Sequence, residues 1–289
     1  MSDYLIRATA LDGRVRAFAA TTTAVVNEIS RRHQMTPTVA AAVGRTATAA
    51  LMMGAMLKGE EKLTVQVKGG GPIGQIVVDV NAAGTVRAYA DEPQVDLPLN
   101  GVGKLDVAGA VGTDGFLYII KDLGLKEPYR GSVPIVSGEI AEDFTYYFAK
   151  SEQTPSAVAL GVLVDVDYSI KAAGGFIIQL LPGLTDDEIA EMEERLSKLP
   201  SVTSMIAQGD SPEMILEQIL PGVKLLERVD AEFRCKCSRE RVEQTVISLG
   251  REEIEAILAE EGQAEVHCHF CNEAYMFEES DLQALLDKM

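Results

Sequence analysis

The chain has 289 residues, of which 47% are hydrophobic and 24% charged, a globular composition with room for more than one compact unit. Its 44 Asp and Glu outnumber 26 Lys and Arg, which gives a net charge of -18. Nucleic-acid binding depends on a basic surface that displaces counterions, so this balance argues against it. The sequence has no run of about 18 apolar residues and no basic-then-apolar leader, and we expect a soluble, cytoplasmic protein that does not bind membranes.

Residues 1–181 predict a body of mixed helix and strand. Strand-like runs, separated by Gly- and Pro-rich turns, lie at 63–67, 74–80, 85–89, 116–120, 158–164 and 176–181. Helical periodicity is clearest at 22–33, 37–57 and 139–150. Because helices and strands do not alternate regularly, we expect an α+β fold with an antiparallel sheet and interspersed helices.

Two features of this body invite functional interpretations that the residues do not favour. The run Gly69-Gly70-Gly71-Pro72 lacks the Gly-Lys-Ser/Thr of a phosphate loop and leads into a strand, so it is better interpreted as a hairpin turn. The Ala-rich stretch 38–57 approaches membrane-spanning length, yet it contains Arg45 and several Thr. It predicts a buried core helix.

Residues 182–228 predict an amphipathic helical linker. Thr185 and Glu188 form a capping-box signature before a charged helix, and Ser211-Pro212 begins a second, shorter helix. The apolar residues of both helices form narrow stripes at helical spacing: Ile189, Met192, Leu196, Leu199, Ile215 and Ile219. Helices this short are marginal alone, so they are either ordinary docked surface helices or a connector whose order depends on its neighbours.

All four cysteines lie near the C-terminus, in a Cys-x-Cys pair and a Cys-x-x-Cys pair separated by 30 residues. Four thiolates from two such pairs can close a tetrahedron around Zn²⁺, so we expect one structural zinc per chain on Cys235, Cys237, Cys268 and Cys271. His267 and His269 are alternative donors, but four cysteines already fill the four places. The sequence has no His-Glu-x-x-His motif, which argues against a zinc hydrolase, and we expect no enzyme.

The zinc-binding domain expected at 229–289 has few large apolar residues and therefore a small core. Structural zinc contributes on the order of 10 kcal/mol or more of apparent folding free energy, so loss of the metal should unfold this domain. The basic neighbours Arg234, Lys236 and Arg239 would favour the oxidisable thiolate form of cysteine. Disulfides within each pair would release zinc and untie the two halves, whereas bridges between the pairs would preserve a crosslink, so the connectivity decides the outcome.

Three segments resemble the redox-regulated zinc chaperones of the heat-shock protein 33 family: Phe233–Arg241 (FRCKCSRER), Leu249–Glu253 (LGREE) and Cys268–Tyr275 (CHFCNEAY). In the body, 33–57 resembles the Ala-rich helix of this family, and 68–72 with 84–89 resembles its sheet region. The resemblance covers essentially the whole chain and includes all four cysteines.

This resemblance implies an ATP-independent holdase chaperone that is inactive while reduced and zinc-bound. Under oxidative stress, the family pattern implies the disulfides Cys235–Cys237 and Cys268–Cys271, release of zinc, and unfolding of the linker and the C-terminal domain. It also implies a homodimer in the active state and clients that are unfolded or oxidatively damaged proteins. Once undocked, the six apolar linker residues named above would be accessible to bind these clients.

Two other classes of function remain open. One is a constitutive zinc-stabilised interaction module, which would protect clients equally before and after oxidation. The other is a zinc-ribbon nucleic-acid binder, and the charge of residues 229–289 disfavours it, since six Lys and Arg stand against fifteen Asp and Glu.

Overall fold

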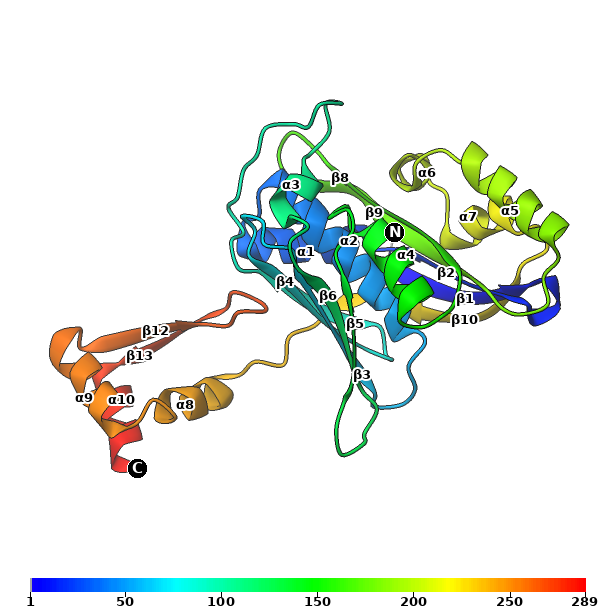
Figure 1. Cartoon of the computed structure of the whole chain (residues 1–289). Helices are drawn as coiled ribbons and strands as arrows, with labels where there is room; N and C mark the ends of the chain where they lie inside the picture. Colours follow the sequence, from blue (N-terminus) through cyan, green and yellow to red (C-terminus); the bar gives the residue numbers. More distant parts are fainter. Residues whose placement is uncertain (1) are drawn as a thin grey trace. The chain divides into compact units, whose positions relative to one another are not determined.

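A five-stranded antiparallel sheet, here called the first sheet, forms one layer of the larger part of the molecule (Figure 1). The computed structural model describes residues 2–289. The strand order is β10-β1-β2-β9-β8, with β1 (Tyr4–Ala10), β2 (Val15–Thr21), β8 (Ser156–Val164), β9 (Ile170–Leu180) and β10 (Lys224–Asp230). The short 3-10 turn Leu11–Gly13 joins β1 to β2. β10 lies at one edge of the sheet, where β1 is its neighbour.

A second, six-stranded sheet has the order β11-β5-β4-β3-β6-β7. Its strands are β3 (Lys62–Lys68), β4 (Gln75–Asn81), β5 (Thr85–Ala90), β6 (Phe116–Asp122), β7 (Tyr129–Pro134) and the two-residue β11 (Glu232–Phe233). All pairings are antiparallel except that of β11 with β5. The meander expected from the runs at 63–67, 74–80 and 85–89 is confirmed, because β3 pairs with β4 and β4 with β5.

The glycine run between β3 and β4 is a hairpin connection, as its sequence predicts. It lies directly against α3 (Val107–Val111), whose last turn accepts a hydrogen bond of 2.9 Å from the Gly71 N–H at the Val111 carbonyl. A Cβ on Gly69 would stand 2.3 Å from that same carbonyl oxygen. The glycines are therefore required by the close approach of two backbones.

Three helices, α1 (Thr23–His33), α2 (Pro37–Gly54) and α4 (Ala141–Lys150), contact both sheets and form the layer between them (Figure 1). Almost every residue of α2 is buried, so the predicted core helix is confirmed. Gly44 sits where α2 meets its neighbours, and a Cβ there would lie 2.6 Å from Val26 Cγ1 and 2.8 Å from Val162 Cγ2. Within residues 2–289, no helix is both long enough and apolar enough to span a bilayer.

The opposite face of the first sheet is covered by α6 (Val202–Gln208) and α7 (Pro212–Ile219), and α5 (Asp186–Lys198) packs against α7 (Figure 1). The predicted capping box of α5 is present, since the Thr185 side chain accepts from Glu188 N–H and Glu188 accepts from Thr185 N–H. Ser211 caps α7 by accepting a hydrogen bond from the Met214 N–H. These helices and the sheet share a hydrophobic cluster, here called the linker cluster, which includes Ile6, Ala17 and Phe176 of the sheet.

The chain divides into two compact units, one ending at Arg234 and the other spanning Cys235–Met289. The smaller unit contains α8 (Arg239–Ile247), α9 (Arg251–Glu260), the hairpin β12 (Gln263–His267) with β13 (Ala274–Glu278), and α10 (Glu279–Asp287). Its buried apolar side chains number seven: Val242, Val246, Ile254, Phe277, Leu282, Leu285 and Leu286. A core of this size is small for an independent unit.

The expected α+β class is confirmed, with antiparallel sheets, interspersed helices and a small C-terminal unit that carries the cysteines. The finer division into 1–181, 182–228 and 229–289 remains a prediction. In the structure, residues 182–228 belong to the larger unit, and residues 229–234 form the end of β10 and the short β11.

Candidate metal centre

The first cysteine pair lies on the segment between β11 and α8. Ser238 follows Cys237 directly and caps α8 by accepting a hydrogen bond from the Arg241 N–H. The Arg241 side chain turns back and donates from Nη1 to the Lys236 carbonyl, which stands between the two cysteines, at 2.8 Å. The start of α8 therefore fixes the backbone on which the Cys-x-Cys thiols are carried.

The second pair lies in the tight loop that joins β12 to β13. Cys268 N–H donates to the Glu273 carbonyl at 3.0 Å, and Asn272 N–H donates to the Cys268 carbonyl at 2.8 Å, so the loop is closed by its own backbone. Asn272 has a φ of 56°, in the left-handed region that Asn tolerates better than most residues. This turn directs Cys268 and Cys271 to the same side.

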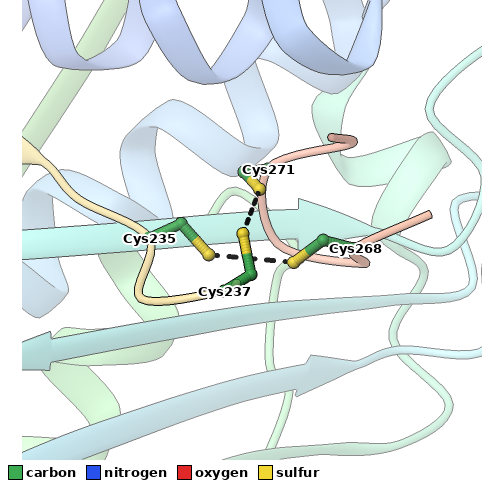
Figure 2. Close-up of side chains that lie close together, drawn as sticks. All are labelled: Cys235, Cys237, Cys268 and Cys271. Carbon is green, nitrogen blue, oxygen red and sulfur yellow. Dashed lines mark hydrogen bonds between the residues drawn. The ribbon is translucent and has the colours of Figure 1, made fainter. Parts of the chain in front are cut away.

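The structure brings all four thiols together, as Figure 2 shows. Their sulfur atoms lie within 4.8 Å of one another, and none of the four is in a disulfide. The sulfurs of Cys235 and Cys268 are 3.7 Å apart, and those of Cys237 and Cys271 are 3.2 Å apart. Both of these contacts join one pair to the other, so the cluster bridges two segments that are distant in the sequence.

These distances fit a tetrahedral metal site. Around Zn²⁺ with Zn–S bonds of about 2.3 Å, neighbouring sulfurs of a regular tetrahedron lie about 3.8 Å apart. The Cys235–Cys268 separation is close to that edge, the Cys237–Cys271 separation is shorter, and both are well beyond a covalent S–S bond of about 2.0 Å. Four thiolates are also the donor set that selects zinc or another thiophilic ion over hard cations such as Mg²⁺. The residues present therefore fit the expected metal.

The pKa of Cys235 is shifted in the opposite direction to those of Cys268 and Cys271. Burial acts to raise the pKa of Cys235, but hydrogen bonds from the Cys237 backbone N–H and from neighbouring thiols outweigh it and lower the pKa to about 7. Burial dominates for Cys271 and Cys268, and raises the pKa of each thiol above its ordinary value. One thiol of the cluster thus becomes a thiolate near neutral pH, while the crowding of sulfurs resists further negative charge.

Two of the basic neighbours expected to favour the thiolate form, Arg234 and Arg239, are paired with carboxylates. Arg234 pairs with Glu232 at 2.8 Å, and Arg239 Nη2 lies 2.8 Å from Asp281 Oδ2. Arg239 also donates to the Met276 carbonyl at 2.8 Å and stacks over the Phe277 ring, 4.6 Å from its centroid. Because these guanidinium groups are engaged by carboxylates, Arg239 serves to fasten α8 to β13 and α10.

Sequence reasoning assigned no role to Tyr275, although it lies in one of the segments that carry the family resemblance. Its hydroxyl donates to Cys237 Sγ at 3.2 Å, and this hydrogen bond is the first cause that raises the tyrosine pKa above its ordinary value. The contact depends on the pairing of Tyr275 with Val266 across the β12–β13 hairpin. No sequence motif signals that register.

The two histidines near the second pair are not members of the cluster that the described residues form for a metal, which consists of the four cysteines. His267 lies on β12, and its Nε2 is 3.0 Å from Glu265 Oε1. His267 is thus engaged by a carboxylate on its own strand.

The six apolar linker residues proposed to bind clients all lie in the linker cluster, on or beside the first sheet. Met192, Ile215 and Ile219 are buried, and the other three are partly buried. In this conformation the stripes are packed within the linker cluster, against the sheet and against one another, so access to them requires the helices to separate from this cluster.

The fold and the thiol site together define the class: an α+β protein whose small C-terminal unit carries a closed site of four thiols. The family model described as "Hsp33 protein" matches residues 3–278. The chain is 59% identical to the 33 kDa chaperonin of Brevibacillus brevis, with all of both chains covered, and 55% identical to that of Bacillus subtilis, with 99% of each covered.

Among solved structures, the crystal structure of the 33 kDa chaperonin, a heat shock protein 33 homolog, from Thermotoga maritima matches with a TM-score of 0.93 and 37% identity. The match covers 100% of this chain and 99% of that one. The chain belongs to the Hsp33 family, and this membership supports a chaperone function.

Proposed function

We propose that the chain is a redox-regulated, ATP-independent holdase chaperone. It is inactive when reduced and zinc-bound, and oxidation activates it by forming disulfides, releasing zinc and unfolding the C-terminal region. The active form protects unfolding proteins from aggregation. The observation that carries this proposal is the convergence of four thiols from two distant segments in a chain of the Hsp33 family.

Cys235, Cys237, Cys268 and Cys271 would hold one zinc ion per chain. When bound, the ion supplies a crosslink between the segments on either side of α8 and α9 and neutralises thiolate charge. Seven buried apolar side chains provide little other stabilisation for the smaller unit. Structural zinc contributes on the order of 10 kcal/mol or more of apparent folding free energy, so the fold of this unit depends on the thiols remaining reduced.

Oxidation by a peroxide converts each pair of thiols to a disulfide. One thiolate attacks a peroxide oxygen, the O–O bond breaks, and the departing hydroxide takes up a proton to leave as water. The second thiolate of the pair attacks the sulfur of the resulting sulfenic acid, the S–S bond forms as the S–O bond breaks, and the departing hydroxide takes up a proton to leave as a second water. Two electrons pass from the sulfurs to the peroxide for each disulfide, and the sulfurs can no longer act as metal ligands.

The family resemblance favours the pairing Cys235–Cys237 with Cys268–Cys271. Disulfides with this connectivity leave nothing in place of the long-range crosslink, so the unit comes apart. The shortest sulfur contacts of the reduced cluster join Cys235 to Cys268 and Cys237 to Cys271, and bridges there would keep the two halves tied. Local pairing is therefore a condition of the switch.

The clients would be unfolded or oxidatively damaged proteins, held by Ile189, Met192, Leu196, Leu199, Ile215 and Ile219. Only β10 and β11 separate these residues from the cysteines along the chain. Both are edge strands, so each is held in its sheet by a single neighbouring strand. We infer that unfolding of the cysteine unit loosens these strands first and the linker helices next.

We further propose a homodimer in the active state, a cytoplasmic location and no nucleic-acid or membrane partner. Four unoxidised thiols suit a reducing compartment. The net charge of -18 repels phosphate backbones and anionic headgroups, and it would keep client-loaded complexes apart in solution.

Measuring zinc content and suppression of client aggregation on one sample, first reduced and then treated with peroxide, tests this function. We expect one zinc and no protection before oxidation, and no zinc and strong protection after it. Equal protection in both states would instead identify a constitutive zinc-stabilised module.

A further inference from the structure

The Tyr275 hydroxyl links the two halves of the thiol site. Tyr275 lies on β13, in the hairpin whose loop carries Cys268 and Cys271, and its O–H donates to the sulfur of Cys237 at 3.2 Å. The hydrogen bond therefore runs from the hairpin of one cysteine pair to a sulfur of the other pair.

The tyrosine side chain is restrained by its strand and by the core of the smaller unit. Its strand pairs with β12, where Val266 is its partner, and its side chain is partly buried against the small core of the unit. Phe277, two residues further along the same strand, is fully buried in that core. The hydroxyl is thus a preorganised donor, with little rotational freedom left to lose when it meets a sulfur.

A donor at this position changes the chemistry of the sulfur it contacts. Four thiolates carry more negative charge than one divalent cation neutralises, and a hydrogen bond to a thiolate disperses part of that excess. Electron density withdrawn in this way is less available for attack on a peroxide oxygen. Groups that orient and polarise metal ligands typically affect metal affinity about 10- to 100-fold.

We propose that Tyr275 is a positioning residue of the thiol site, whose hydroxyl holds Cys237 Sγ among the ligands and slows both metal loss and oxidation at that sulfur. This inference rests on the proposed function, since it concerns how firmly the reduced state is kept. Tyr275 sets how much oxidant is needed to open the switch.

The test is Tyr275→Phe, which removes one oxygen atom and keeps the ring. In the reduced, zinc-loaded full-length protein, we expect a chromophoric chelator to withdraw zinc about tenfold faster or more, and peroxide to release zinc at a lower dose. With Co²⁺ in place of zinc, we expect the sulfur-to-metal charge-transfer band to move to lower energy, because the sulfur lone pair has lost its hydrogen bond. Unchanged zinc release with an unmoved band would overturn the inference.

Two controls separate the hydroxyl from general destabilisation. Phe277→Leu loosens the core beside Tyr275 but keeps the hydroxyl, so it should speed metal loss without moving the cobalt band. Tyr168→Phe removes the hydroxyl of a tyrosine in the larger unit that is 58% exposed, and it should change neither readout. If Phe277→Leu moved the band as Tyr275→Phe does, the hydroxyl would have no specific role.

The same samples distinguish this inference from the proposed function. If wild type binds one zinc and loses it to peroxide while Tyr275→Phe behaves identically, the inference fails and the proposed function stands. If reduced wild type binds no metal, both fail.

Discussion

Arg14 and Glu188 form a bidentate ion pair, in which Arg14 Nη1 lies 2.7 Å from Glu188 Oε2 and Nη2 lies 2.7 Å from Oε1. Arg14 directly follows the turn between β1 and β2, and it also donates to the Gly183 carbonyl at 2.9 Å. Glu188 lies in the first turn of α5. The pair therefore fastens the first linker helix to the first sheet.

Because of this ion pair, we expect the docking of the first linker helix to weaken at acidic pH. The hydrogen bond from Arg14 is the main cause that lowers the Glu188 pKa to about 2, from an ordinary value of 4.5. Since the folded-state pKa is depressed, the stabilisation is complete above about pH 4.5 and is lost as pH falls toward 2. In Glu188→Gln we expect a melting midpoint lower by a few degrees at most at pH 7, and a difference from wild type that shrinks on acidification.

The matched control for this experiment is Glu194→Gln on the same helix. Glu194 pairs with Lys198 on the solvent side of α5, without contact to the sheet in that pair. An equal loss of α5 amide protection in both variants would contradict the role of Arg14 and Glu188.

For Asp3 we expect a pH dependence of stability opposite to that of the Arg14–Glu188 pair. Its side chain is 7% exposed at the N-terminus of α1, where Oδ2 accepts a hydrogen bond of 2.7 Å from Val25 N–H. Burial raises its pKa from 3.8 to about 6, so the folded state holds the proton more tightly and the contribution of this group to stability falls as pH rises from about 4 to 6.

Asp3→Asn keeps an acceptor for Val25 N–H without a charge. Relative to wild type, its free energy of unfolding should rise by at most about 3 kcal/mol between pH 4 and pH 7, measured by urea unfolding at each pH. Asp12→Asn, in the exposed turn after β1, is the control. A parallel pH profile for Asp3→Asn and wild type would refute the assignment.

Any side chain larger than that of Gly44 should clash with neighbouring residues in the middle of α2. Alanine is the better helix former by about 1 kcal/mol, but its Cβ would stand 2.6 Å from Val26 and 2.8 Å from Val162 in a close-packed layer. We expect Gly44→Ala to destabilise the larger unit by about 1–3 kcal/mol in urea unfolding. Gly101→Ala, where a Cβ would meet no atom within 4 Å, should have little effect.

We expect the Cys268→Ser substitution to abolish metal binding and to unfold the smaller unit. Three remaining thiolates do not close the tetrahedron, so zinc per chain should fall from one toward zero, and amides of 235–289 should exchange rapidly. His267→Gln should retain one zinc, since the cluster consists of the four cysteines. Equal zinc content in Cys268→Ser and wild type would exclude this cysteine as a ligand.

The cysteine site was largely predictable because its signal is local. The spacing within each pair is short, and four identical donors make one tetrahedral centre the simplest arrangement. Likewise, Thr185 and Ser211 begin helices α5 and α7 as their capping signatures predict. The helix caps and the spacing within each cysteine pair depend on residues within a few positions of one another.

The features that escaped prediction depend on distant partners. Strand β10 is exposed along most of its length and has no alternating apolar pattern, so only its pairing with β1 identifies it. The stripes of α5 and α7 predict helices that dock, but not that they dock on the face of the first sheet that carries Ile6 and Phe176. The contact of Tyr275 with Cys237 likewise needs the β12–β13 register.

Native mass spectrometry of the reduced full-length chain, before and after peroxide, tests most directly whether zinc on four thiols keeps the C-terminal unit folded. We predict a mass increased by one zinc before oxidation. Afterwards we predict a metal-free chain with two disulfides, Cys235–Cys237 and Cys268–Cys271 by peptide mapping, and a broadened distribution of charge states from unfolding. A reduced chain that is metal-free and still compact would contradict this account.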